Sequence, residues 1–275
     1  MFRGEMVDLP GGSFLMGSDR DYMEEAPVQR IEVGSFFIDR FAVTNADYAR
    51  FVKATGYVTQ AEIAPSTADY PDAPAKLLRP GSAVFVQPHH GARPRHELDW
   101  WEFRIGADWR HPEGPGSDIT DRMDHPVVHV AYSDAVAFAR WCGKSLPTEA
   151  EWEFAARGGI DGATFAWGEE LMPGGQQMAN HWQGTFPFED LLHSGTVRTM
   201  RVGSFPANGY GLFDMIGNVW EWTADAFCDR RSSSGCCGKV AGTTVARVIK
   251  GEPRRVCRRL ISVSYAAMAS VSRAA

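Results

Sequence analysis

FPANGYGLFDMIGNVWEWTAD, residues 205–225, is the stretch of this sequence that constrains the fold most strongly. It is rich in aromatic side chains, but Gly209, Gly211 and Gly217 interrupt any helical or strand period. Glycine adopts the positive φ angles that sharply bent backbone needs. We therefore expect irregular backbone folded beneath large rings, and neither an amphipathic helix nor a simple strand.

The polar residues of the same stretch suggest a cation site. Asp214, Asn218 and Glu221 place oxygen atoms among turning carbonyl groups, which is how proteins hold a hard cation such as Ca²⁺. The alternative is a tryptophan-rich core turn whose polar groups only satisfy the backbone. Spacing alone leaves both interpretations open.

The composition indicates a globular protein with many loops. A chain of 275 residues that is 44% hydrophobic can bury one large core or two small ones, and nine Trp, 28 Gly and 16 Pro favour irregular loops held by aromatic side chains. A net charge of −6 argues against nucleic-acid binding. We find no signal peptide and no stretch long enough for a transmembrane helix, so we expect no membrane partner and a cytoplasmic, monomeric protein.

The five cysteines do not suggest a disulfide framework, because their number is odd and no secretory signal precedes them. Cys142 lies in a helical pattern and is expected to be a small buried hydrophobic residue. Cys236 and Cys237 are neighbours in a Ser/Gly-rich loop. That pair is a soft-metal candidate, but a solvated loop without a nearby histidine gives it little support.

Local patterns predict a few short elements. Residues 6–17, MVDLPGGSFLMG, predict two strands joined by a turn, and residues 29–39, QRIEVGSFFID, predict one further strand on the same sheet. A helix follows, capped by Thr44 or Asn45 and ended by Gly56.

Two further helices are expected in the middle of the chain. Residues 132–143 form one, with Ser133 as its cap, and LPTEAEWEFAARGG forms the next, with a capping box between Thr148 and Glu151. Glu149, Glu151 and Glu153 suit the positive end of that helix. A paired-carboxylate catalytic role is less favoured, because successive odd positions on a helix point in different directions.

Residues 60–125 show little periodicity, although their tryptophans argue against disorder. The segment also holds histidines that lack the spacing of a metal-ligand pair, and we interpret them as surface loop residues: His89, His90, His96 and His111.

Several motifs together resemble one known family. DMIGNVWEW with NGYGL before it, LPTEAEWEFAARGG, PGGSFLMGS, FAVTNADYARFV and ANHWQG resemble the sulfatase-modifying-factor family, the formylglycine-generating enzymes, over roughly residues 6–251. The resemblance implies an α+β fold of the irregular C-type-lectin-like kind, with low regular secondary structure. It also implies that Trp220 faces the substrate groove, and packing in the core is the alternative for this residue.

The resemblance implies two calcium sites. The first takes the Asn180 side chain and the His181 carbonyl, with further ligands from the segment ending at Val202. The family usually has Asp-Gly where this chain has Ser194–Gly195, so that site has lost a charge unless Glu189 or Asp190 replaces it. The second site is intact, and its ligands are the side chains of Asp214 and Glu221 and the carbonyls of Gly217 and Val219. The second site should therefore bind Ca²⁺ more tightly than the first.

The end of the chain departs from the family pattern. In the family, a Lys-Gly-Gly-Ser segment leads to two cysteines that bind Cu(I), and the copper activates O₂ to oxidise a sulfatase cysteine in a Cys-x-Pro-x-Arg context to formylglycine. Here residues 248–251 match, but only Cys257 then lies near the first expected cysteine, and Ile261 stands where the second should be. We take Cys257 as the candidate catalytic residue and note that one cysteine cannot supply a two-thiolate copper site.

We therefore divide the chain into a sulfatase-modifying-factor-like domain, residues 1–251, and a divergent tail, residues 252–275. A reading-frame shift after Gly251 and a disordered tail are both hypotheses for that tail. The favoured function is that of a formylglycine-generating-enzyme-like protein, acting on a sulfatase polypeptide or similar cysteine-containing client, with an incomplete active site. The alternative is a catalytically inactive, calcium-stabilised module that binds a peptide or protein. A relation to the iron-dependent sulfoxide synthases is least favoured, because the chain starts directly on the PGGSF strand.

Overall fold

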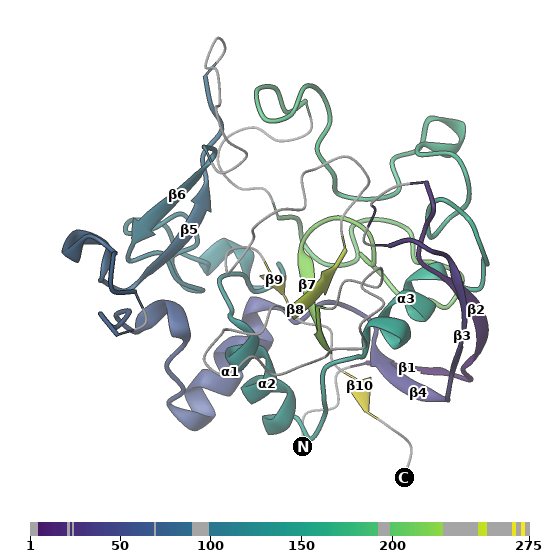
Figure 1. Ribbon diagram of the computed structural model, residues 1–275, viewed down its shortest axis with the longest axis horizontal. Helices are drawn as coiled ribbons and strands as arrows, with labels where there is room; N and C mark the ends of the chain where they lie inside the picture. The colour runs from purple at the N-terminus through teal and green to yellow at the C-terminus, as the bar shows by residue number, and fades with distance from the viewer. Residues whose placement is uncertain are drawn as a thin grey trace.

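The computed structural model describes residues 5–20, 23, 25–68, 70–89, 99–191, 199–227 and 247–251, together with the backbone of 266–267 and 271–272. Three α-helices and several small sheets in these residues are joined by long irregular segments (Figure 1). The expected α+β fold with low regular structure is confirmed. No helix in the described part of the chain is long and apolar enough to span a bilayer.

The N-terminal strands form two hairpin-like pairs. Strands β1 (Met6–Leu9) and β2 (Gly12–Met16) follow each other as predicted, with a turn between them. The single strand expected over residues 29–39 is wrong: β3 (Gln29–Val33) pairs with β2, and β4 (Phe36–Asp39) pairs with β1. Gly34 and Ser35 interrupt the alternation, which allows the two halves to join different sheets.

Cap residues determine where helices α1 and α3 begin. Helix α1 (Asn45–Thr55) begins after Thr44, whose side chain accepts from the Asp47 amide at 3.2 Å, and ends at Gly56 in the left-handed conformation. Helix α3 (Glu149–Arg157) has the expected capping box, in which the Thr148 amide donates to the Glu151 carboxylate at 2.7 Å. Both predictions are confirmed.

Helix α2 (Tyr132–Trp141) starts differently from the prediction. Its cap residue is Ala131, whose amide donates to the Asp134 carboxylate at 2.8 Å, so Ser133 is not the cap. The Asp134 carboxylate in the first helical turn accepts from the backbone amide of the cap residue, as the acidic residue of a capping box does.

The segment without clear periodicity contains the hairpin of β5 (Gly81–Phe85) and β6 (Trp101–Ile105), which the sequence did not reveal. Short 3₁₀ turns also punctuate the chain: η1 (Gln60–Glu62), η2 (Ala75–Leu77), η3 (Thr120–Arg122) and η4 (Pro173–Gly175).

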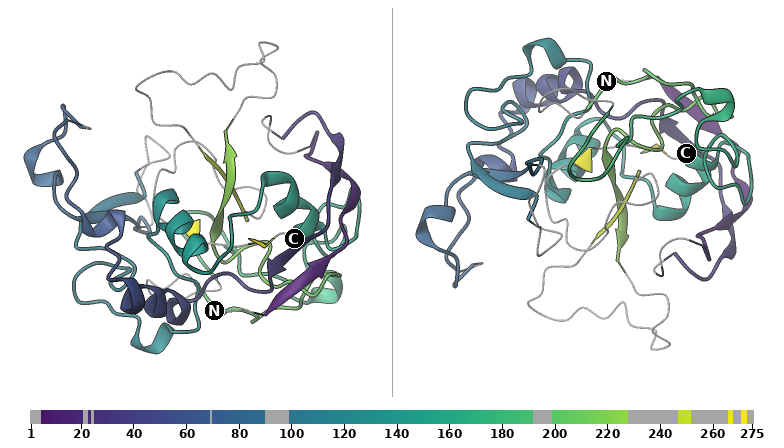
Figure 2. Two further views of the ribbon diagram at one scale, coloured as in Figure 1. Left: turned by 90° about the horizontal axis from the view of Figure 1, so that it is seen from below. Right: turned by 90° about the horizontal axis from the view of Figure 1, so that it is seen from above.

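A small central sheet lies between the hairpins. Strand β7 (Trp220–Ala226) pairs with β8 (Arg247–Lys250) on one edge and with β9 (Ala266–Ala267) on the other. Strand β10 (Val271–Ser272) adds to β4. Figures 1 and 2 show β7 in the middle of the molecule, with the β5–β6 and β2–β3 hairpins on opposite sides of it.

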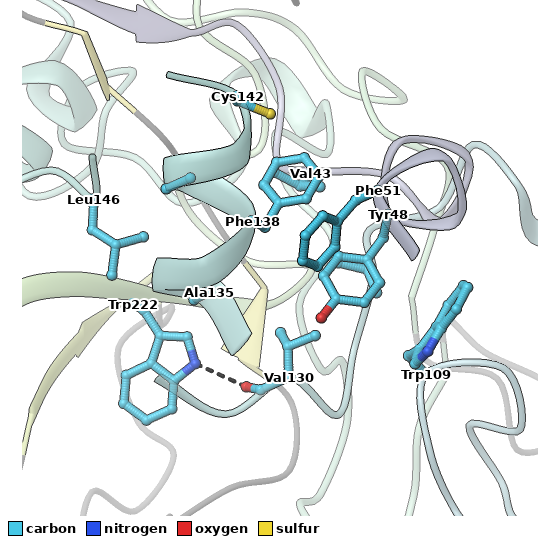
Figure 3. Packing of buried hydrophobic residues seen from close by; sticks show 12 residues of the cluster. Val43, Tyr48, Phe51, Trp109, Val130, Ala135, Phe138, Cys142, Leu146 and Trp222 are labelled. Carbon is cyan, nitrogen blue, oxygen red and sulfur yellow. Dashed lines mark hydrogen bonds between the residues drawn. The ribbon is translucent and has the colours of Figure 1, made fainter. Parts of the chain in front are cut away.

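Two main hydrophobic clusters flank β7. One joins α1 and α2 through Tyr48, Phe51 and Phe138, and receives Trp222 of β7, whose indole N–H donates to the Val130 carbonyl at 2.9 Å (Figure 3). The other joins α3 to the N-terminal strands. Cys142 lies in the first cluster as a buried residue, as predicted, and burial raises the pKa of its thiol to about 11.

Candidate functional site

The segment just before β7 is a tight turn with left-handed backbone. Asp214, Gly217 and Asn218 have φ angles of 55°, 84° and 63°. A Cβ at Gly217 would stand 2.2 Å from the Asn180 carbonyl oxygen, so only glycine fits there. The expected sharply bent backbone is confirmed for the residues before Trp220, whereas the expectation that the stretch contains no simple strand is wrong, because Trp220–Ala226 form β7.

Residues expected in the two different calcium sites meet at this turn. The Asn218 amide donates to the Asn180 carbonyl at 2.8 Å, and the Asn180 side-chain Nδ2 donates to the Asn218 Oδ1 at 3.0 Å. The Gly217 amide donates to the Gly251 carbonyl at 2.7 Å, which ties the turn to the end of β8. His181 follows Asn180, and its ring Nδ1 lies 3.1 Å from the Ala179 carbonyl oxygen.

Two carboxylates flank the turn. Asp214 accepts from the Gly203 amide at 2.7 Å, and burial raises its pKa despite that hydrogen bond. Glu221 is 3% exposed and accepts from the indole N–H of Trp152 at 2.6 Å. Burial raises the pKa of Glu221 to about 7, against the Trp152 hydrogen bond, and the negative charges of Asp214 and Asp39 add to the rise.

The oxygen atoms at this turn are of the chemical type that a hard cation takes, and calcium binding here stays a prediction. A buried carboxylate whose ionised form is disfavoured by a neighbouring carboxylate gains most from a bound positive charge. Ca²⁺ accepts six to eight oxygen ligands, including backbone carbonyls. No cluster of three or more His, Cys, Asp and Glu side chains in the described residues could hold a metal, so a cation here would need the carbonyls of Gly217 and Val219 as well as the two carboxylates.

The first expected site is described only in part. Asn180 is buried and His181 half-buried, whereas Ser194 and Gly195 lie outside the described residues. Glu189 is exposed and Asp190 half-buried.

A buried ion cluster fixes β8 against α3. The Lys250 ammonium lies 2.9 Å from a Glu149 carboxylate oxygen and 3.1 Å from one of Glu153, and Glu153 also accepts from the Gly17 amide at 2.7 Å and from Arg157 at 2.6 Å. Burial alone would lower the pKa of Lys250, but the two carboxylates raise it. Burial opposes ionisation of Glu153, yet Lys250, the Gly17 amide and Arg157 bring its pKa down to about 2.

These contacts were not visible in the sequence, which assigned the glutamates to the helix start alone. Lys250 immediately precedes Gly251, whose carbonyl accepts the hydrogen bond from the Gly217 amide. The ion cluster therefore helps to position that carbonyl.

Trp220 belongs to a partly buried group of rings outside the three buried core clusters. Its ring centroid lies 6.5 Å from that of Trp101, which packs 5.9 Å from Phe85, and the rings of Trp182 and Phe186 pack at 5.0 Å. We call these rings the aromatic cluster: Phe85, Trp100, Trp101, Trp182, Phe186 and Trp220. It gathers β6, the ANHWQG segment and the first residue of β7, and Trp220 itself is half-buried.

Most of the cysteines lie outside the described residues, so the predictions about their thiols are not tested. Cys257, Cys236, Cys237 and Cys228 all lie there. Cys142, the one cysteine that the structure describes, is buried in the core with a raised pKa. The described part of the chain therefore supplies no two-thiolate copper site.

Of the histidines noted in the sequence, His89 is exposed, and the His111 Nδ1 lies 3.1 Å from the Asp108 carboxylate, while His90 and His96 lie outside the described residues. Sequence reasoning passed over His129, which is buried between the Ser82 hydroxyl and the Pro112 carbonyl at 2.9 and 2.7 Å. The only signal for it was its place in an apolar run, VVHV.

Comparison with known proteins shows the family of this chain. The Sulfatase-modifying factor enzyme 1-like domain matches residues 3–273, which extends beyond Gly251. The chain is 52% identical over 256 residues to the formylglycine-generating enzyme of Mycobacterium tuberculosis, with 90% of this chain and 85% of that protein covered. It is 43% identical to the inactive C-alpha-formylglycine-generating enzyme 2 of Bos taurus, with 81% and 71% covered.

The fold also matches solved structures. PvdO from Pseudomonas aeruginosa superposes with a TM-score of 0.57 at 23% identity, covering 98% of this chain and 95% of that one. From the family match and the identities, this chain belongs to the sulfatase-modifying-factor family, the family of the formylglycine-generating enzymes.

Proposed function

We propose that this chain binds a cysteine-containing segment of a sulfatase, in a Cys-x-Pro-x-Arg context, on a calcium-stabilised formylglycine-generating scaffold. The family description names sulfatases as the proteins modified, and the relative from Mycobacterium tuberculosis is named for formylglycine generation. The reaction proposed by family is oxidation of that cysteine by O₂ with copper.

The aromatic cluster is the observation that carries the binding proposal. Trp220 and Trp101 are half-buried and lie outside the buried core clusters, so part of each residue is exposed to solvent. Aromatic surfaces recognise proline-containing extended peptides, and an arginine side chain stacks on such rings. Both residue types occur in the proposed client motif.

The sequence supports the oxidation of the peptide less than it supports peptide binding. Two-coordinate Cu(I) prefers two soft ligands. Cys257 stands near the place of the first family cysteine, and Ile261 stands at the place of the second. We therefore propose that peptide binding is retained and that conversion to formylglycine is slow or absent.

The inactive relative of Bos taurus supports a second candidate function, a binding module without turnover. Its 43% identity shows that the family retains the scaffold in a member named as inactive. In this chain the same outcome would follow from the missing second thiol.

Peptide binding tests the proposal. A fluorescent Cys-x-Pro-x-Arg peptide should bind, and replacing its Pro and Arg by Ala should weaken binding. Trp220→Phe should weaken peptide binding while leaving the melting temperature nearly unchanged. Trp167→Phe is the matched control, because Trp167 is also half-buried and stacks on Phe165 at 5.2 Å, outside the aromatic cluster.

Equal affinity for the intact and Ala-substituted peptides would contradict the proposal. If Trp220→Phe lowered the melting temperature strongly and left peptide binding intact, Trp220 would be a core residue and not part of the binding surface.

A further inference from the structure

His129 is a buried histidine that contacts the β5–β6 hairpin. It is 1% exposed, and Ser82 of β5, to which it is hydrogen-bonded, is 2% exposed. Its Nε2 atom lies 2.7 Å from the Pro112 carbonyl oxygen, and its Nδ1 atom lies 2.9 Å from the Ser82 hydroxyl oxygen. Because a carbonyl oxygen only accepts, Nε2 carries the proton, and Nδ1 of the neutral ring accepts from the Ser82 hydroxyl. His129 therefore joins the hairpin to the segment that contains Pro112.

The residue after His129 contacts a different element. The Val130 carbonyl accepts from the indole N–H of Trp222 on β7 at 2.9 Å (Figure 3). His129 itself has a φ angle of 57°, in the left-handed region that few residues other than glycine adopt. Such a backbone conformation persists only where the surrounding structure holds it. Two consecutive residues thus link the β5–β6 hairpin and β7.

These two elements carry two sides of the aromatic cluster. Phe85 lies on the same strand as Ser82 and directly opposite Trp101 in the register of the hairpin. The Trp101 ring in turn lies 6.5 Å from the ring of Trp220, the first residue of β7. A shift of the hairpin relative to β7 would therefore change the separation of Trp101 and Trp220. The contact between His129 and Ser82 opposes such a shift.

We infer that His129 is a positioning residue for peptide binding, which holds the β5–β6 hairpin relative to β7 so that Trp101 and Trp220 form one surface. This inference rests on the proposed function, because the peptide is the ligand proposed for the aromatic cluster. The His129 side chain is itself buried, so it acts through the two tryptophans and not by touching the peptide.

The charge state of His129 should control this contact. Charged and titratable side chains lie on the hairpin and on the segment after it: Arg104, Asp108, His111, Glu113 and Arg122. Burial lowers the pKa of His129, and the hydrogen bond to the Pro112 carbonyl and the negative charges of Asp108 and Glu113 oppose this effect. The folded protein therefore favours the neutral ring. Protonation would turn Nδ1 into a second donor, and the Ser82 hydroxyl could then no longer donate to it.

The largest possible effect of acid follows from the ordinary pKa of histidine. If the hairpin separates from His129 and exposes the ring, the pKa of the ring returns to about 6.5. Because the pKa in the folded protein is the lower one, the contact is fully present above pH 6.5 and is lost as the pH falls below that value. Lowering the pH from about 7.5 to about 5 favours the separated form by at most about 30-fold. Peptide affinity falls with the fraction of molecules in which the hairpin is in place.

Peptide affinity of the full chain near pH 7.5 and near pH 5 tests the inference, with a Cys-x-Pro-x-Arg peptide whose termini are blocked. His129→Leu removes the bonds to Ser82 and Pro112 and should weaken binding near neutral pH by about tenfold. His129→Gln keeps a donor and an acceptor but does not titrate, so it should restore most of the affinity and lose less of it in acid. The pKa of Glu221 is also raised to about 7, so the acid effect is read as the difference between His129→Gln and the unchanged chain.

Two further measurements separate positioning from general stability. Asn208→Ala is the matched control, because the Asn208 side chain donates to the Ala155 and Ala156 carbonyls of α3, in the other hydrophobic cluster. It should lower the melting temperature and leave peptide affinity unchanged. Hydrogen exchange needs no peptide: His129→Leu should speed exchange of the β5–β6 amides, His129→Gln should restore their protection, and α3 should stay as it is in the unchanged chain.

The outcomes distinguish this inference from the proposed function. Unchanged exchange of the hairpin amides in His129→Leu would refute the positioning role, whether or not the peptide binds. Faster exchange with a peptide affinity equal to that of Asn208→Ala would make the contact purely structural and would also refute it. The same is true if His129→Gln and the unchanged chain lose affinity equally in acid. If the unchanged chain does not bind the peptide at all, the proposed function fails, and the role of His129 in binding fails with it.

Discussion

Replacing Glu221 by Gln should change the stability of this protein in opposite directions with and without calcium. Glu221 is buried on β7, and its carboxylate has one protein donor, the Trp152 indole, among the hydrogen bonds of the described residues. Without a cation, its negative charge is opposed by burial and by Asp214. With Ca²⁺ bound, the same charge becomes a favourable ligand.

The size of the metal-free effect follows from the pKa. Burial and neighbouring charges raise the pKa of Glu221 from 4.5 to about 7, and each unit corresponds to about 1.4 kcal/mol. Since the folded-state pKa is the higher one, this group favours folding below pH 4.5, and that contribution is lost as the pH rises to 7. The loss is about 3 kcal/mol above pH 7. An amide lacks this loss, but its NH₂ group costs about 1 kcal/mol if unpaired. At pH 8 in a chelator, Glu221→Gln should therefore stabilise the fold by about 2 kcal/mol.

Urea unfolding followed by tryptophan fluorescence measures both cases. In saturating Ca²⁺ the variant should be less stable than the unchanged chain. It lacks one charged ligand and therefore binds Ca²⁺ more weakly, so the bound ion adds less to the free energy of unfolding. Glu102→Gln serves as a control at an exposed carboxylate, with an expected change under about 0.5 kcal/mol. If Glu221→Gln destabilised the fold equally in chelator and in Ca²⁺, the assignment of Glu221 to a cation site would be refuted.

Two further expectations concern the scaffold of the site. Gly217→Ala should lower the free energy of unfolding by several kcal/mol in urea titrations, because its Cβ would stand 2.2 Å from the Asn180 carbonyl oxygen. Gly116→Ala, also at positive φ but with open space around it, should cost only about 1–2 kcal/mol, and equal losses for both would refute the steric argument. Acid should lower the free energy of unfolding through Glu153, because its pKa in the folded protein is depressed from 4.5 to about 2. The ionised carboxylate stabilises the fold above pH 4.5, and this stabilisation is lost as the pH falls from 4.5 towards 2. Glu153→Gln should flatten that part of the stability curve in chemical denaturation, and an unchanged slope would contradict the assignment.

The elements that the sequence predicted well depend on neighbouring residues. The caps at Thr44, Gly56 and Thr148 are local hydrogen bonds or backbone conformations, so a short pattern contains all the information they need. The β5–β6 hairpin was missed because its strands are separated by a long segment and their pairing is not local. The split of residues 29–39 into β3 and β4 likewise depends on which sheet each half joins.

The candidate site shows the same division. The resemblance named Asn180, Gly217 and Glu221, but not the hydrogen bonds that join Asn180 to Asn218 across 38 positions. The Lys250–Glu153 contact spans 97 positions and has no local signature either. Trp220 lies in a half-buried aromatic cluster, and its contact with the substrate stays a prediction. The binding of calcium ions and the catalytic role of Cys257 stay predictions as well.

The most direct test of the account is a mass measurement on a reacted peptide. A Cys-x-Pro-x-Arg peptide is incubated with the full chain, O₂ and added copper, and its mass is followed for conversion of the thiol to an aldehyde. The account predicts that the peptide binds but keeps its thiol, because Cys257 has no second cysteine at the family spacing. Conversion by the unchanged chain that is lost on Cys257→Ser would contradict it, and would show that the copper site is completed in another way.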